Sequence, residues 1–313
     1  MANACACNAG LSNTGTGCSP FWQVAVKLIV VPYYDADGAQ NFIDLSDTLN
    51  QAYFTALINE ADTTLRWLPM PSMLNVEDTR SESLMETFEN GSMMFVQQGS
   101  RSFKAIVAGR DATPQLLGNL NSFRCVPFGV FGVDKQGNLI GSIGTQDNCD
   151  ILNIYPIRVD ENSWDPTWTK PTDKTVQKIN MGFYFHMDED DSSLRMITAA
   201  EHGANLLTVK GLIDVCSEYS NLELTSFTVT LNTYFGTVLN PVRVEGLVAA
   251  DFALYNVTDS LSVTILTSTE TSDGVYDITY AAQTGLDVLR LTPTLTGYDF
   301  AQVVANTIDL PAT

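Results

Sequence analysis

Phe21-Trp-Gln-Val-Ala-Val-Lys-Leu-Ile-Val-Val-Pro-Tyr-Tyr34 is the segment of this chain that says most about its architecture. Most of its residues are β-branched or aromatic, which favours a strand over a helix. In a strand, every second side chain lies on the same face, and here that face is apolar throughout: Trp22, Val24, Val26, Leu28 and Val30. We therefore expect a buried β-strand here and a mainly β fold around it.

Strand patterns recur along the chain, often as pairs separated by turn residues. The two clearest pairs are Met93–Gln98 with Arg101–Val107 across Gly99-Ser100, and Phe123–Val133 with Leu139–Ile143 across residues 134–138. Two alternating runs joined by a few glycine-containing residues are typical of β-hairpins. The sequence thus predicts antiparallel sheets.

One segment has helical periodicity instead. Apolar residues recur at spacings of three and four between Leu49 and Leu65. Asp44 and Asp47 precede them, where helix-capping residues are common. We expect a single flanking helix over about residues 45–66.

The length of 313 residues favours more than one domain. Composition changes near Leu239-Asn-Pro241, beyond which lysine is absent and threonine is frequent. We expect a flexible arm over residues 1–20, a β domain over 21–238 and an immunoglobulin-like sandwich over 239–313. Within the last, Asp273-Gly-Val-Tyr276-Asp-Ile278 resembles the tyrosine-corner segment of such sandwiches.

The chain is strongly acidic, with 36 acidic residues against 16 basic ones and a net charge of -20. This balance argues against nucleic-acid binding, because a DNA-binding surface needs lysine and arginine to displace counterions. Residues 91–133 are an exception, with four basic residues against Asp111. They are a solvated loop or, if copies of the chain stack, a surface that meets an acidic segment of the next copy. The candidate contact residues are Arg101, Lys104, Arg110 and Arg124 on the basic side, and Glu77, Asp78, Asp188, Glu189, Asp190 and Asp191 on the acidic side.

Signals for catalysis or cofactor binding are weak. Cys5, Cys7 and Cys18 could supply three thiols to a metal, but no fourth ligand stands at a suitable spacing. The only histidines, His186 and His202, have no nucleophile setting around them, and no phosphate-binding glycine loop is present. We expect no enzyme activity, no bound metal and no cofactor.

The order of elements, a strand, a helix, a hairpin-rich middle and a terminal sandwich, resembles the major tail tube proteins of long-tailed bacteriophages. Three stretches are the most similar: Asn75–Arg80, Asn90–Val96 and Val244–Phe252. The resemblance implies a tail-tube-like β-sandwich or barrel with one flanking α-helix, followed by an immunoglobulin-like β-sandwich. In that family six copies close a ring through an inner β-barrel, rings stack into a tube, and immunoglobulin-like domains decorate the outside.

The resemblance also implies a function and partners. The chain would be a structural protein of the virion tail, assembled in the host cytoplasm and used in genome delivery. Its partners would be further copies in stacked hexameric rings and other tail proteins. DNA would pass without being bound specifically, since excess carboxylates repel phosphate, and no membrane would take part.

Two alternatives remain open from the sequence. Within the same class, the chain could be a head-decoration protein or a tail terminator, which forms one ring and does not polymerise. From a different class, it could be a carbohydrate-binding adhesin module, because Trp164 and Trp168 lie in an acidic, threonine-rich chain.

Overall fold

The computed structural model describes residues 21–146, 150–237 and 239–312. It is mainly β, as the sequence predicts. The chain divides into two compact units: unit 1 ends at Lys210 and unit 2 begins at Gly211. Among the helices in the described ranges, none is long and apolar enough to cross a membrane.

The boundary between the units lies earlier than the composition indicates. Residues ahead of Leu239 form β15 (Ile213–Ser220) and β16 (Ser226–Gly236), and β16 pairs with β21 (Val275–Tyr280) of unit 2. The boundary predicted at residue 239 is therefore displaced to residues 210 and 211. The shift in composition therefore falls within unit 2. β16 belongs to this unit because its backbone pairs with β21, and such pairing does not depend on how many lysines a strand contains.

Unit 1 is built on two antiparallel sheets. The large sheet has the strand order β14-β9-β8-β1-β3, with β11 also paired to β8, and the small sheet has the order β12-β13-β7-β4. The large sheet contains β1 (Ala25–Pro32), β3 (Leu68–Pro69), β8 (Phe128–Asp134), β9 (Leu139–Ser142), β11 (Ile157–Arg158) and β14 (Leu194–Ile197). The small sheet contains β4 (Leu74–Arg80), β7 (Arg101–Ala108), β12 (Thr167–Thr169) and β13 (Lys178–Tyr184). Two further ladders pair β2 (Ile43–Asp44) with β10 (Asn153–Ile154), and β5 (Leu84–Thr87) with β6 (Met93–Gln97).

The main core of unit 1 lies between these two sheets. β1 places Leu28 and Val30 in it, opposite phenylalanines of the small sheet such as Phe103. The buried strand expected from the first segment is thus confirmed. Trp22 and Val24 are not part of its buried face: they precede the strand and are each 43% exposed.

The other face of the large sheet is covered as well. Phe131 of β8 stacks on Trp67 with ring centroids 4.8 Å apart, and Trp67 in turn contacts Phe54 of α1 (Gln51–Ile58) at 5.8 Å. All three side chains are buried. β1 and β8 are therefore central strands with apolar contacts on both faces.

Helix α1 is much shorter than the span of 45–66 predicted from periodicity. Its N-cap is Asn50, whose side-chain oxygen accepts a hydrogen bond from the Tyr53 amide at 3.0 Å. Asp44 belongs to β2 instead, opposite Asn153 of β10. The amphipathic spacing extended the prediction across turns and irregular connections, which lie on both sides of α1 between β2 and β3.

A second helix, α2 (Pro114–Asn121), was not predicted and covers part of the unit 1 core. Two tryptophan side chains are hydrogen-bonded to this region: Trp164 Nε1 donates to the Leu120 carbonyl at 2.7 Å, and Trp168 Nε1 donates to the Ala112 carbonyl at 3.2 Å. Trp164 is only 2% exposed. It therefore offers no exposed ring on which a sugar could stack.

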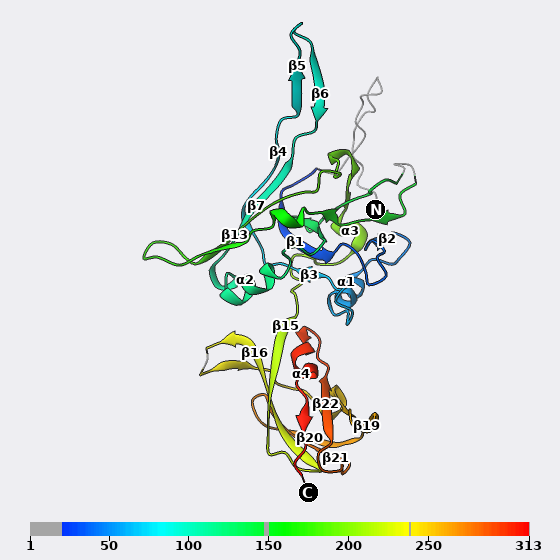
Figure 1. Ribbon diagram of the computed structural model, residues 1–313, viewed down its shortest axis with the longest axis vertical. Coiled ribbons are helices and arrows are strands. Elements are labelled where there is room, and N and C mark those ends of the chain that lie inside the picture. The colour runs from blue at the N-terminus through cyan, green and yellow to red at the C-terminus, as the bar shows by residue number, and fades with distance from the viewer. Residues whose placement is uncertain (1–20, 147–149, 238, 313) are drawn as a thin grey trace. The chain divides into compact units, whose positions relative to one another are not determined.

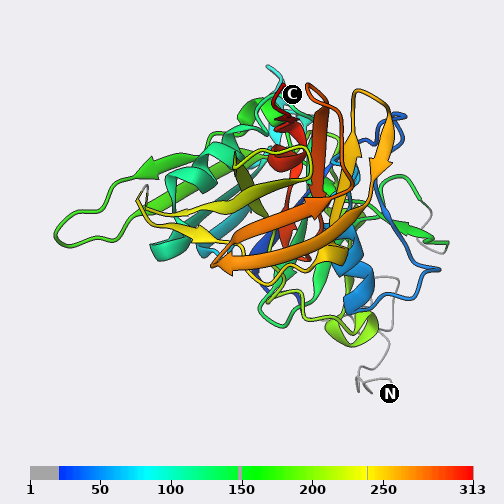
Figure 2. The same cartoon turned by 90° about the horizontal axis from the view of Figure 1, so that it is seen from below.

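Unit 2 is a second two-sheet sandwich, with strands coloured yellow-green to red in Figures 1 and 2. One sheet has the order β20-β21-β16-β15-β23, with β17 also paired to β16, and the other has the order β19-β18-β22-β24. Its remaining strands are β17 (Pro241–Arg243), β18 (Phe252–Asn256), β19 (Leu261–Val263), β20 (Ile265–Ser272), β22 (Val288–Pro293), β23 (Tyr298–Asp299) and β24 (Ile308–Asp309). The other α-helices of the described residues are α3 (Ala199–His202) in unit 1 and α4 (Ala301–Ala305) in unit 2.

Two buried tyrosines organise the core of unit 2. The Tyr276 hydroxyl donates to the Val244 carbonyl at 2.8 Å, and the Tyr280 hydroxyl donates to the Glu223 carbonyl at 2.7 Å. Burial raises the pKa of each phenol to about 12, so both hydroxyls remain donors at physiological pH. Tyr276 is the tyrosine of the segment that resembles a tyrosine corner. The similarity of unit 2 to immunoglobulin domains stays a prediction.

Candidate functional site at a projecting hairpin

A long hairpin extends from the small sheet beyond the rest of unit 1 (Figure 1). Its outer part, residues 81–99, contains β5 and β6 and is called the arm below. Every residue of these two strands is exposed. The arm nevertheless carries large apolar side chains that are 43% to 64% exposed: Leu84, Met85, Phe88, Met93, Met94, Phe95 and Val96. Clusters of this kind on a soluble surface mark interaction sites.

The turn of the arm lies at Asn90-Gly91, not at Gly99-Ser100 as predicted. The Phe88 amide donates to the Ser92 carbonyl at 2.8 Å, and Gly91 has a φ of +81°, which glycine adopts without steric cost. β6 then pairs with β5, and β7 pairs with β4. The two predicted strand patterns therefore exist but do not pair with each other.

Gly99 lies at the base of the arm, where the two backbone segments of the hairpin approach each other closely. A Cβ atom at Gly99 would lie 1.9 Å from the Ser81 carbonyl oxygen, so no other residue fits without moving the backbone. The Ser81 amide donates to the Ser100 carbonyl at 2.9 Å across the same point. Gly99 thus permits the close crossing that separates the arm from the small sheet.

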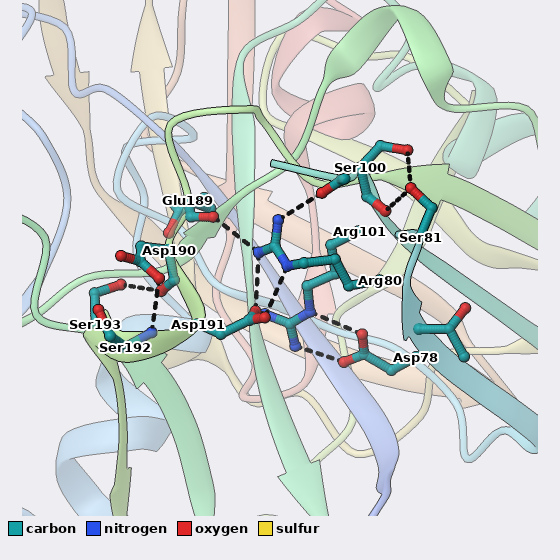
Figure 3. A network of polar contacts seen from close by, with 12 residues as sticks. Asp78, Arg80, Ser81, Ser100, Arg101, Glu189, Asp190, Asp191, Ser192 and Ser193 are labelled. Carbon is teal, nitrogen blue, oxygen red and sulfur yellow. Dashed lines mark hydrogen bonds and ion pairs between the residues drawn. The ribbon is translucent and has the colours of Figure 1, made fainter. Parts of the chain in front are cut away.

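Arg80 binds three different groups just below this crossing (Figure 3). Its Nε and Nη2 atoms form a bidentate pair with Asp191 at 2.7 Å and 2.9 Å. Its Nη1 donates to the Gly99 carbonyl at 2.8 Å, and Nη2 also donates to the Glu189 carbonyl at 3.0 Å. A single guanidinium therefore connects the end of β4, the base of the arm and the loop of residues 188–191.

Arg101 makes a second bidentate pair on the neighbouring strand. Its Nε and Nη2 atoms donate to the Asp78 carboxylate at 2.8 Å and 2.5 Å, and its Nη1 lies 3.6 Å from Asp191. The guanidinium also stacks over the Phe185 ring, 4.4 Å from the centroid. The side chain is 11% exposed, so these contacts are largely shielded from water.

The two arginines are directly opposite each other in the β4–β7 register. Like charges in that position repel. Here Asp78 and Asp191 supply two carboxylates for the two guanidiniums. These ion pairs offset the repulsion between the arginines, and their bidentate geometry fixes the orientation of both guanidinium planes. This group of four side chains is called the base network below.

The carboxylates of the adjacent loop differ in their electrostatics. The hydrogen bond from Arg80 lowers the pKa of Asp191, and a hydrogen bond from the Ser192 amide lowers the pKa of Asp190. Burial instead raises the pKa of Glu189, whose Oε1 accepts from the Arg158 amide at 2.8 Å. Of these three carboxylates, only that of Asp191 contacts the two arginines of the base network.

The structure brings together some of the residues that the sequence singled out. Asp78, Arg101 and Asp191 meet within one chain, and Glu189 and Asp190 lie beside them (Figure 3). Asp78, Arg101 and Asp191 thus have their ion-pair partners inside the subunit, whereas Asp190 is exposed and its carboxylate accepts a hydrogen bond from the Ser192 amide.

The other candidates lie elsewhere. Lys104 is opposite Glu77 in the β4–β7 register, on the face of the small sheet away from the core. Arg124 forms an exposed pair with Asp165. Asp188 contacts the His186 ring at 3.2 Å, and Arg110 is exposed in a 3-10 turn. Cys5, Cys7 and Cys18 lie outside the described residues.

Arg80 is the functional residue that the prediction missed. Its signal was present in the alternation Val76, Asp78, Arg80, which places a core residue, an acid and a base on one strand face. Sequence spacing could not show that Asp191, more than a hundred residues away, completes the contact.

Sites of other kinds are not evident in the described ranges. They contain no group of three or more histidine, cysteine, aspartate or glutamate side chains arranged to hold a metal. A shallow cavity of about 530 Å³ is lined mainly by aliphatic residues such as Leu45, Ile154 and Ile197. Sequence comparison adds no relative: no protein-family model matches the chain, and no curated protein matches it significantly.

Proposed function

We propose that this chain is a structural subunit that assembles with copies of itself into stacked rings, as a tail tube protein of a long-tailed bacteriophage does. The observation that carries the proposal is the arm. It exposes methionine and phenylalanine side chains such as Met94 and Phe95, at 60% and 56%, on a hairpin that has no apolar layer beneath it. Complete burial of such a side chain contributes about 1.5–3 kcal/mol, and since these are about half exposed, burial in an interface would contribute roughly half of that for each.

The small sheet supports ring formation. β4 and β12 are its edge strands, so each has backbone groups free to pair along one side. Exposed edges invite pairing with another chain, and a closed ring of copies satisfies all of them at once. The copy number of six and the place of the immunoglobulin-like unit outside the ring are taken from the resemblance to the tail tube family alone.

The face of the small sheet away from the core supports the proposal of a passage that DNA traverses without being bound. Thr79 and Ser102 lie opposite each other on this face, and Lys104 lies opposite Glu77. The same face carries Lys178 on β13, so its charged residues in these ladders are two lysines and one glutamate, in a chain whose net charge is -20. Few phosphate contacts could form, so DNA would slide through without specific binding. The proposed location is accordingly the virion tail, with no enzymatic role.

Negative-stain electron microscopy of the purified full-length chain tests this function. Rings or tubes with a central hole are expected, and sedimentation velocity should show the corresponding large species. A variant with Met93, Met94 and Phe95 changed to serine should keep its fold and lose assembly, because these side chains make little contact in the monomer. Discrete monomers of the unmodified protein would overturn the proposal, whereas single rings that never stack would favour a tail terminator.

A further inference from the structure

A second projecting hairpin carries the opposite charge to the arm. Residues 170–178, called the basic loop below, connect β12 to β13 and contain Lys170, Lys174 and Lys178 against Asp173 alone. Three of the seven lysines of this acidic chain therefore lie within nine residues. The basic loop is the strongest concentration of lysine in the sequence.

The basic loop has a defined backbone. Thr169 pairs with Lys178 at the end of the β12–β13 ladder. Further out, the Thr172 amide donates to the Thr175 carbonyl at 2.9 Å, and the two threonine hydroxyls are 2.7 Å apart. Val176 is 62% exposed beside the lysines. The loop is thus a preformed surface with both positive charge and apolar area.

The arm is complementary in both respects. Residues 81–99 contain Glu82, Glu86 and Glu89 and no basic residue. Unlike the carboxylates of the base network, these three have no hydrogen-bond or ion-pair partner for their side chains in the described parts of the chain. The same holds for the side-chain amines of the three lysines of the basic loop.

Within one chain these two surfaces cannot pair. The arm and the basic loop extend from the small sheet in different directions, and their tips are far apart in Figure 1. The basic loop also extends away from the rest of unit 1 when the molecule is viewed along the perpendicular direction (Figure 2). A partner for either surface must therefore come from another molecule.

We propose that the arm of one copy docks on the basic loop of a second copy. The inference rests on the proposed self-assembly and names the two surfaces that meet in it. Two copies with a net charge of -20 repel each other, so a stable contact requires a local reversal of sign. Lys170, Lys174 and Lys178 provide that reversal for the glutamates of the arm, while Val176 faces the apolar side chains.

This contact is heterologous, because the arm and the basic loop are different surfaces of the same chain. A subunit that donates its arm to one neighbour can receive the arm of another neighbour. Repetition of this step produces a closed ring or an open stack, which is the type of assembly proposed above.

Charge exchange provides the test. The arm variant changes Glu82, Glu86 and Glu89 to lysine, and the loop variant changes Lys170, Lys174 and Lys178 to glutamate. Each alone should raise the critical concentration for assembly on the order of 100-fold, since like charges then face each other across the interface. Mixing the two variants should restore assembly to near the wild-type value. In the mixture, complementary surfaces are present only on different chains, so recovery reports an intermolecular contact.

A control variant keeps the net charge of the loop variant but changes other exposed bases, Arg110, Lys135 and Lys210, to glutamate. It should assemble normally alone and should not rescue the arm variant. If wild-type chains assemble but the arm and loop variants assemble equally well, or if their mixture stays unassembled, the docking inference is wrong and the proposed function stands. If wild-type chains remain monomers, both are wrong.

Discussion

β8 and β6 are strands of similar apolar composition that meet opposite environments. Phe131 of β8 is fully buried between Trp67 and the large sheet, whereas Phe95 of β6 is 56% exposed on the arm. The hydrophobic effect is proportional to the apolar area removed from water, so Phe131 stabilises the subunit and Phe95 contributes little to it. The apolar side chains of the arm are therefore not accounted for by the stability of the subunit, in agreement with the proposed contact to another copy.

A matched pair of phenylalanine truncations gives the largest expected contrast. Phe131→Ala should lower the free energy of unfolding of unit 1 by about 3–5 kcal/mol, because it removes a buried ring and leaves a cavity beside Trp67. All four tryptophans lie in unit 1, so tryptophan fluorescence during urea denaturation reports this unit alone.

Phe95→Ala is the control for that measurement. It should change the unfolding free energy by no more than about 0.5 kcal/mol, as is usual for exposed positions. It should nevertheless weaken assembly in sedimentation velocity. Equal losses of stability in the two variants would show that the arm is packed in the monomer.

The base network should give an intermediate effect. Arg80→Ala removes the bidentate contact to Asp191 and the hydrogen bond to the Gly99 carbonyl, from a side chain that is 18% exposed. We expect a loss of about 1–2 kcal/mol, lowered from the range for charged hydrogen bonds because Asp191 is half exposed. Hydrogen exchange should also accelerate at the Ser81 amide, which bonds across the base of the arm.

Arg124→Ala is the matched control for this arginine. Its ion pair with Asp165 joins side chains that are 50% and 69% exposed, so its removal should cost no more than about 0.5 kcal/mol. If Arg124→Ala destabilises unit 1 as much as Arg80→Ala does, the base network has no special role in holding the arm.

The sequence predicted the parts of the fold that depend on local periodicity. Alternation identified β1, and the turn between β8 and β9 is where residues 134–138 place it. The same rule found the strand at Met93 but paired it with the wrong partner, because both Asn90-Gly91 and Gly99-Ser100 are compatible with a turn. Only the tight approach of Gly99 to Ser81 distinguishes the turn from the crossing.

For the candidate site, the sequence indicated which charged residues matter but not which of them contact one another. Charge counting singled out Arg101, Asp78 and Asp191, yet it assigned them to contacts between subunits. The structure shows that they neutralise each other within one chain. The tertiary fold decides which charged side chains remain unpaired, including those of the arm and the basic loop. The spacing of residues along the sequence does not show which charges will meet.

The smallest expected effect is a dependence of the stability of unit 1 on pH, through the buried side chain of His202. His202 Nε2 lies 3.0 Å from the Gly137 carbonyl and must donate to it, while Nδ1 must accept from the Ala204 amide at 3.1 Å. The fold therefore requires the neutral ring, and burial lowers the pKa of His202 below its ordinary value.

The sign of the pH dependence follows from that shift. The unfolded chain binds a proton at His202 near pH 6.5, whereas the folded chain resists it. The contribution of His202 to stability is thus complete above about pH 6.5 and is lost as pH falls toward the lower folded pKa. Unit 1 should become less stable between pH 7.5 and 5.5, and His202→Gln should reduce that slope. His186→Gln is the control, because the His186 side chain is 29% exposed and contacts a carboxylate. The His202 ring also packs edge-on against the buried Phe54 ring, with centroids 5.6 Å apart, so this apolar contact disfavours the charged ring. A slope unchanged by His202→Gln would show that the proton is taken up elsewhere.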